Sequence, residues 1–163
     1  IGHTAAATAR KAASPTRTTA WTVEEIVDAA QSKQGQPVAE LLREIIGWAE
    51  ASRLAIQCGT GALPSLKLIY GSSVAFDITV YNTGPRLYLS YITARGYEVL
   101  DPELNIITDK LAALAGTRAA PVNNRSYPGL VLDARITQTE NQQALLSLVE
   151  TFLTLLKQAP KNA

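Results

Sequence analysis

Apolar and polar residues alternate most clearly in the middle of the chain, over residues 74–81 (VAFDITVY). Val74, Phe76, Ile78 and Val80 fall on one side of this segment, and Ala75, Asp77, Thr79 and Tyr81 fall on the other. A period of two is typical of a strand that buries one face. Residues 54–58, 66–70 and 86–94 are also strand-like. The pattern predicts an antiparallel sheet of four strands with one polar face.

The segment between the last two strands, residues 82–85 (NTGP), is predicted to be the loop of a hairpin, because glycine and proline both favour turns. In that register Tyr88 lies opposite Thr79, and Ser90 lies opposite Asp77.

Apolar residues recur at three- and four-residue spacing on both sides of the strands, which predicts amphipathic helices. Helices are expected to begin at Thr22, Pro37, Asp101 and Thr139. A short extended piece at residues 130–132 adds a fifth strand. The expected fold is α+β in the order α-α-β-β-β-β-α-(β)-α, with the helices packed on one face of an antiparallel sheet.

The first 20 residues are rich in Ala and Thr and show no apolar period. They are expected to form a flexible basic tail or linker that carries Arg10, Lys11 and Arg17 without an acidic residue. Residues 21–163 are long enough for one domain with a core. Because the chain begins with Ile1 and contains no Met, we expect it to be cut from a longer chain or processed.

The composition excludes several function classes. The formal net charge is +1, so any attraction to nucleic acid must be local. A single cysteine, Cys58, excludes an intramolecular disulfide, and no apolar run is long enough to cross a bilayer. A cytoplasmic location without a membrane partner is expected.

Residues that commonly carry out catalysis are few. His3 is the only histidine and lies in the predicted tail, which argues against Ser-His and Cys-His pairs. Gly59-Thr60-Gly61 lacks a third glycine and precedes a strand instead of a helix, so a turn is predicted there and not a phosphate-binding loop. We therefore expect no catalytic residue, no metal site and no cofactor.

One alternative keeps an enzymatic role. Asp77 with Glu98 or Asp101 could hold a divalent ion, as in a metal-dependent nuclease or hydrolase remnant. The strand after Asp77 nevertheless lacks the acid-x-Lys pair of restriction-type nucleases.

The polar side of the predicted hairpin offers a binding surface for nucleic acid or a protein partner. Aromatic and cationic side chains on a sheet can stack bases and contact phosphates. The candidates are Lys67, Tyr81, Arg86 and Tyr88 on the sheet, and Arg118, Asn123, Arg125 and Tyr127 in the loop over residues 117–129. A homo-oligomer is a third alternative, because Trp48, Ile69 and Ile92 fall outside the predicted core stripes.

Three longer stretches of the sequence resemble a known kind of domain. They are LLREIIGWAEASRLAIQCGTG, DPELNIITDKLAALAG and, before the last helix, RSYPGLVLDARI. Over residues 38–156 the chain resembles an uncharacterised bacterial α+β accessory domain that is associated with DNA-restriction and defence proteins. The resemblance implies an accessory or recognition role and supplies no catalytic residue.

Overall fold

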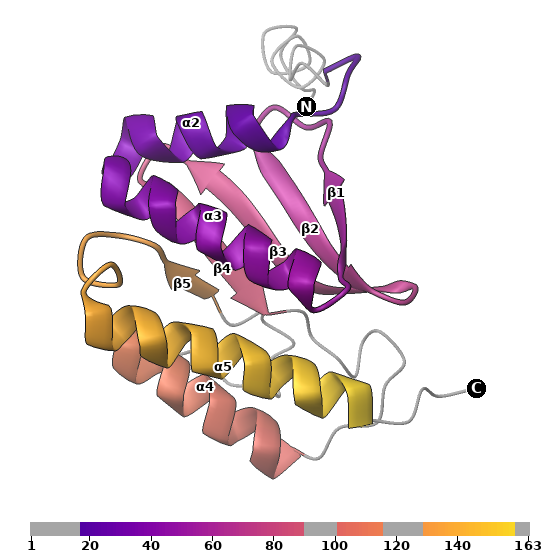
Figure 1. The fold of residues 1–163 in the computed structure, drawn as a ribbon, viewed down its shortest axis with the longest axis vertical. Helices are drawn as coiled ribbons and strands as arrows, with labels where there is room; N and C mark the ends of the chain where they lie inside the picture. The colour runs from indigo at the N-terminus through magenta and orange to yellow at the C-terminus, as the bar shows by residue number, and fades with distance from the viewer. Residues whose placement is uncertain (1–16, 90–100, 116–128, 159–163) are drawn as a thin grey trace, which may run out of the picture.

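The structure is a computed structural model that describes residues 17–89, 101–115 and 129–158. These residues form an α+β fold with an antiparallel sheet, as predicted (Figure 1). The elements are α2 (Val23–Gln34), α3 (Gln36–Ala51), β1 (Ala55–Cys58), β2 (Ser65–Tyr70), β3 (Ser73–Tyr81), β4 (Gly84–Leu89), α4 (Asp101–Ala115), β5 (Gly129–Val131) and α5 (Thr139–Gln158).

The five strands lie in the sheet in the order in which they occur in the chain, β1-β2-β3-β4-β5, and each neighbouring pair is antiparallel. Consecutive strands joined by short turns favour this arrangement. The fourth strand was expected to run to residue 94, but the described part of β4 ends at Leu89, and residues 90–94 lie outside the described residues.

The predicted register of the β3–β4 hairpin was wrong by two residues. Tyr81 pairs with Gly84, so only Asn82 and Thr83 form the turn, and Asp77 lies opposite Tyr88 instead of Ser90. Gly84 belongs to β4 with φ at +115°, a conformation that glycine adopts without strain.

Pro85 belongs to β4 as well, because its missing N–H does not interrupt the pairing with β3. The carbonyl of Pro85 accepts a hydrogen bond from Leu132 N–H (2.9 Å), so its backbone points away from β3. A proline is tolerated in a strand at such a position.

The alternation in β3 changes near its start because of a β-bulge. The register shifts between Leu68 and Ile69 of β2, which leaves Ala75 without a direct partner. Ala75 is fully buried and Val74 is only half-buried, the reverse of the predicted sides.

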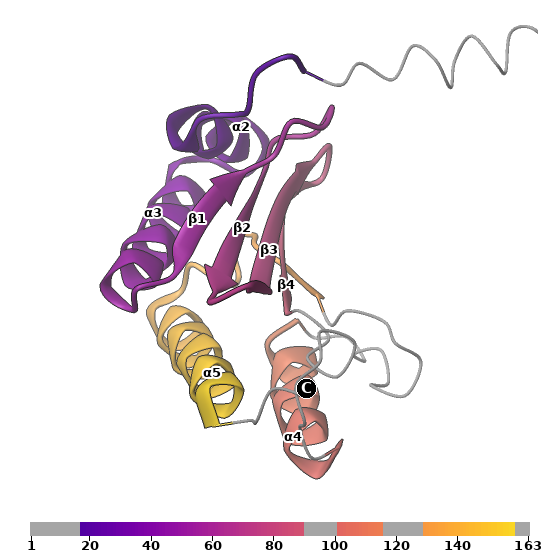
Figure 2. The ribbon, with the colours of Figure 1, turned by 90° about the vertical axis from the view of Figure 1, so that its right-hand side faces the viewer.

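The helices α2, α3 and α5 cover one face of the sheet (Figure 2). The predicted capping box starts α2: Thr22 Oγ1 accepts from Glu25 N–H (3.1 Å), and Glu25 Oε2 accepts from Thr22 N–H (2.8 Å). Trp48 of α3 packs edge-on against Phe76 with ring centroids 5.7 Å apart. Trp48 therefore contacts the core, which removes the reason for assigning it to a subunit interface.

The remaining helix, α4, packs against α5 and β5 at the side of the molecule that lies away from α2 (Figure 1). Phe152 of α5 continues the core, with its ring centroid 5.2 Å from that of Phe76. Over the residues that the structure describes, no helix combines the length and the apolar character needed to span a membrane.

Candidate binding surface

The face of the sheet opposite the helices carries the predicted polar residues; we call it the open face. Residues that are paired across neighbouring strands lie on the same face of the sheet. One such row of paired residues on the open face crosses all five strands. Its members are Gln57, Lys67, Asp77, Tyr88 and Gly129. A second row contains Ser65, Thr79, Arg86 and Val131, and Tyr81 lies two residues beyond Thr79 on β3. The structure thus brings Lys67, Tyr81, Arg86 and Tyr88 onto one face, as predicted.

Arg86 is the cation at the centre of this face. Its guanidinium carbon lies 5.2 Å from the centroid of the Tyr81 ring, within cation–π range. No carboxylate among the described residues forms an ion pair with Arg86. Its Nε is buried and has no hydrogen-bond partner in the described part of the chain. Among the described residues, no carboxylate therefore neutralises the charge of Arg86 through an ion pair.

The two tyrosines of the open face contact each other. A hydrogen bond links the Tyr81 and Tyr88 hydroxyls, whose oxygens are 3.4 Å apart. This bond and then burial raise the pKa of Tyr81 above its ordinary value, because both favour the neutral phenol. The Tyr88 ring lies over Gly129 of β5, where a side chain would leave it no room: an added Cβ would sit 2.7 Å from two ring carbons.

Asp77 is the acid on the open face, between Lys67 and Tyr88. Its Oδ1 accepts from the Thr79 hydroxyl (2.9 Å), and the side chain is half-buried. Among the described residues, no group of three His, Cys, Asp or Glu side chains could hold a metal ion. Glu98 and the side chain of Asp101 lie outside the described residues, so the metal-dependent alternative stays a prediction.

The other candidates are distributed as follows. Arg118, Asn123, Arg125 and Tyr127, with Ile92 and the tail residues Arg10 and Lys11, lie outside the described residues. Arg17 is described and is bound to the domain, away from the open face. Its guanidinium lies 3.8 Å from the centroid of the Trp21 ring and pairs with Glu25 (3.2 Å).

The Gly59-Thr60-Gly61 segment is the predicted turn between two strands. Its carbonyls accept hydrogen bonds from the segment that precedes α2: Arg17 N–H donates to Thr60 (2.8 Å), and Trp21 donates through its backbone N–H to Gly59 (2.9 Å) and through Nε1 to Gly61 (2.9 Å). A phosphate-binding loop would instead point N–H groups at its anion. The turn anchors Trp21 and also residues 17–20, which the sequence analysis assigned to a flexible tail.

Cys58 ends β1 and is half-buried. Burial raises the pKa of its thiol, which lowers the thiolate fraction at neutral pH. A thiol with a smaller thiolate fraction is less reactive as a nucleophile.

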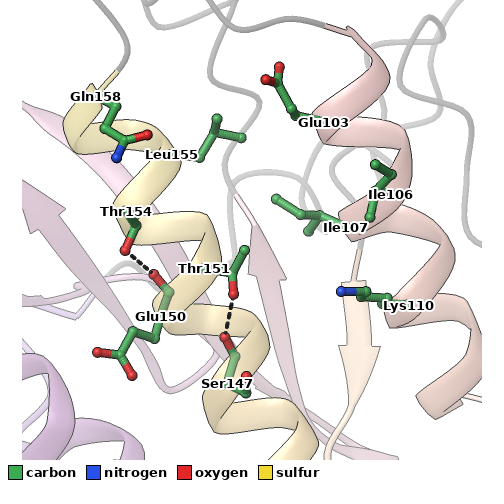
Figure 3. Close-up of a pocket in the computed structure, with 10 residues that line it drawn as sticks. All are labelled: Glu103, Ile106, Ile107, Lys110, Ser147, Glu150, Thr151, Thr154, Leu155 and Gln158. Carbon is green, nitrogen blue, oxygen red and sulfur yellow. Dashed lines mark hydrogen bonds between the residues drawn. The ribbon is translucent and has the colours of Figure 1, made fainter.

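A separate groove of about 650 Å³ lies between α4 and α5 (Figure 3). Ile106 and Ile107 of α4 face Leu155 of α5 across it, and Ile106 is 55% exposed. The hydroxyls of Thr151 and Thr154 donate to carbonyls of their own helix. The lining also includes the charged or polar side chains of Glu103, Lys110, Glu150 and Gln158, and it contains none of the residues predicted for the binding surface.

In the row that crosses all five strands, sequence reasoning missed two members, Gln57 and Gly129. Gln57 could have been found from the order of strands, since β1 precedes β2 by a short turn. Gly129 could be placed only after β5 was paired with β4, because a glycine carries no side-chain signal of its own.

Comparisons of this chain with protein-family models, with curated proteins and with solved structures find no match. The resemblance to a defence-associated accessory domain therefore stays a prediction, and the geometry of the open face is the basis for a functional proposal.

Proposed function

We propose that the chain is a non-catalytic binding domain that holds single-stranded nucleic acid on the open face. The observation that carries the proposal is Arg86: a guanidinium beside the Tyr81 ring, without an ion-pair partner among the described residues. Such a cation can contact a phosphate or stack on a base without first breaking a salt bridge.

The neighbours of Arg86 fit the same ligand. Tyr88 and Tyr81 supply aromatic rings on adjacent strands, and base–aromatic stacking contributes about 1–3 kcal/mol per base. Lys67 is exposed two strands away from Tyr88 and can contact the backbone of a strand that crosses the sheet. The extended, half-exposed surface suits a flexible single strand better than a duplex, whose bases are stacked inside.

The test is a titration of labelled single- and double-stranded DNA and RNA with the purified chain at low and moderate salt. We expect single strands to bind more tightly and the affinity to fall as salt rises, because phosphate contacts release counterions. Absence of binding to every oligonucleotide at low salt would overturn the proposal.

A pair of arginine variants locates the site. Arg86→Ala should weaken binding by roughly tenfold, in the range expected for one stacked or phosphate-bound arginine. Arg43→Ala makes the same chemical change on α3, on the helix side of the sheet, and should leave the affinity within about twofold. Equal losses in both variants would mean that nucleic acid binds elsewhere. Adding Mg²⁺ to the same samples and following oligonucleotide length tests the metal-dependent hydrolase alternative.

A further inference from the structure

On the outer edge of β1, backbone groups have no pairing partner among the described residues. β1 is the first strand of the sheet and pairs only with β2. In the view of Figure 2, β1 forms the near edge of the sheet, and no described helix or strand lies outside it. An edge of this kind can pair with a further strand.

The register identifies which residues point outward. Gly59 N–H donates to the Ser65 carbonyl (2.8 Å), so the backbone of Gly59 faces β2. In an antiparallel ladder, backbone direction alternates along the strand. Gln57 and Ala55 therefore also face β2, and the N–H and C=O groups of Ile56 and Cys58 face the free edge. Among the described residues, no hydrogen bond to these four groups is found beyond the β1–β2 ladder.

The sequence of β1 lacks the features that usually protect an edge. Its four residues, AIQC, include no charge and no proline, and β1 has no bulge in its pairing with β2. Ile56 and Cys58 are only half-buried, although their side chains face the helix side of the sheet and pack against the core. A neighbouring strand would cover the remaining apolar surface of both.

We propose that β1 pairs with β1 of a second copy of this chain, antiparallel about a twofold axis through Gln57. In this register Ile56 lies opposite the partner's Cys58, and Cys58 lies opposite the partner's Ile56. All four outward groups of each copy are then used, in four main-chain hydrogen bonds. A register centred on Ile56 would pair Cys58 with the partner's Leu54, whose N–H already donates to Ala49 in its own copy.

The composition of β1 suits pairing with the same strand of a second copy. A twofold interface brings each residue close to its own equivalent, so a charged edge would repel itself. β1 carries no charge, and the exposed Gln57 amide can both donate and accept a hydrogen bond across the axis.

Such a dimer has a geometrical consequence for the open face. The axis is perpendicular to the sheet, so the open faces of both copies lie on the same side of one continuous sheet. The two β4 strands are seven strand spacings apart, about 34 Å. If the proposed function holds, one long single strand could contact Arg86 in both copies; the dimer itself does not depend on that function.

The experiment measures self-association without nucleic acid, by sedimentation equilibrium over a concentration series. Gln57→Lys places two ammonium groups beside the axis and should raise the dimer dissociation constant by about tenfold or more. Gln143→Lys makes the same charge change on an exposed position of α5 and should leave the constant within about twofold. A wild-type chain that stays monomeric, or a dimer that Gln57→Lys does not weaken, would overturn the proposal.

A cross-link fixes the register. With oxidised glutathione, Ile56→Cys should form a disulfide-linked dimer through the partner's Cys58. Residues opposite each other in a hydrogen-bonded antiparallel pair have Cα atoms about 5.5 Å apart, a separation that a disulfide spans. The wild-type chain should form little of it, since two Cys58 residues are not opposed in this register. Circular dichroism checks that Ile56→Cys is folded. A folded variant that does not cross-link would exclude the Gln57-centred pairing.

Discussion

The two faces of the sheet are built from alternate residues of the same strands, yet they differ in what holds their side chains. On the covered face, Phe76 and Leu87 are completely buried among the helices. On the open face, Arg86 and Tyr88 are half-buried, and their described side-chain contacts are mainly to neighbours on the sheet. Stability and surface chemistry are therefore carried by alternate residues. A substitution should affect mainly one of the two.

The largest expected effect comes from the covered face. Phe76→Ala removes a ring that contacts both Trp48 and Phe152, and it should lower the free energy of unfolding by about 3–5 kcal/mol. Asp77→Ala changes the adjacent residue, which lies on the open face, and removes one hydrogen bond with Thr79. It should lower the free energy of unfolding by about 1 kcal/mol or less. Urea denaturation of both variants measures the difference. Similar losses would refute the separation of the two faces.

The covered face was the part that the sequence predicted well. Alternation identifies the inward residues of β3, because burying one face requires apolar residues at every second position. The same pattern could not reveal the bulge at Ala75, since an alanine is compatible with either side. The alternation pattern also could not identify the cross-strand partners on the open face. Moving a hairpin register by two residues keeps every side chain on its face. Tyr88 was therefore placed on the correct face but opposite the wrong residue.

The β3–β4 turn should be the next most sensitive position. Gly84→Ala forces a side chain into φ of +115° and places its Cβ 2.5 Å from Gln34 Cγ and 3.0 Å from Gln34 Nε2. The same Nε2 donates a hydrogen bond to the Thr83 carbonyl (2.7 Å). We expect a loss of about 2 kcal/mol in the free energy of unfolding. Gly61→Ala is the matched control, because an added Cβ meets no atom within 4 Å there. Equal stability of the two variants would contradict the strained geometry at Gly84.

Gly129→Ala should change stability less, and its main effect should be to move a side chain of the open face. In Gly129→Ala the new Cβ would lie 2.7 Å from the Tyr88 ring, so the ring must move away from β5. We expect a loss of at most about 1 kcal/mol, together with changed NMR shifts for the Tyr88 ring. Unchanged Tyr88 shifts would show that the ring does not rest on Gly129.

The smallest effect concerns a single proton on the open face. Tyr88→Phe removes the hydroxyl that contributes most to raising the pKa of Tyr81, so that pKa should fall toward its ordinary value of 10.0. NMR of ¹³C-labelled tyrosine measures it, and Tyr70→Phe on β2 serves as the control. Because the folded-state pKa is the higher one, the stabilisation from the neutral phenol is complete below the unfolded-state pKa and is lost as pH rises through the folded-state pKa. Tyr88→Phe should therefore slightly lower the stability at pH 7, where this contribution is complete, and reduce the further loss of stability above about pH 10. An unchanged Tyr81 pKa would mean that the two hydroxyls do not share a hydrogen bond in solution.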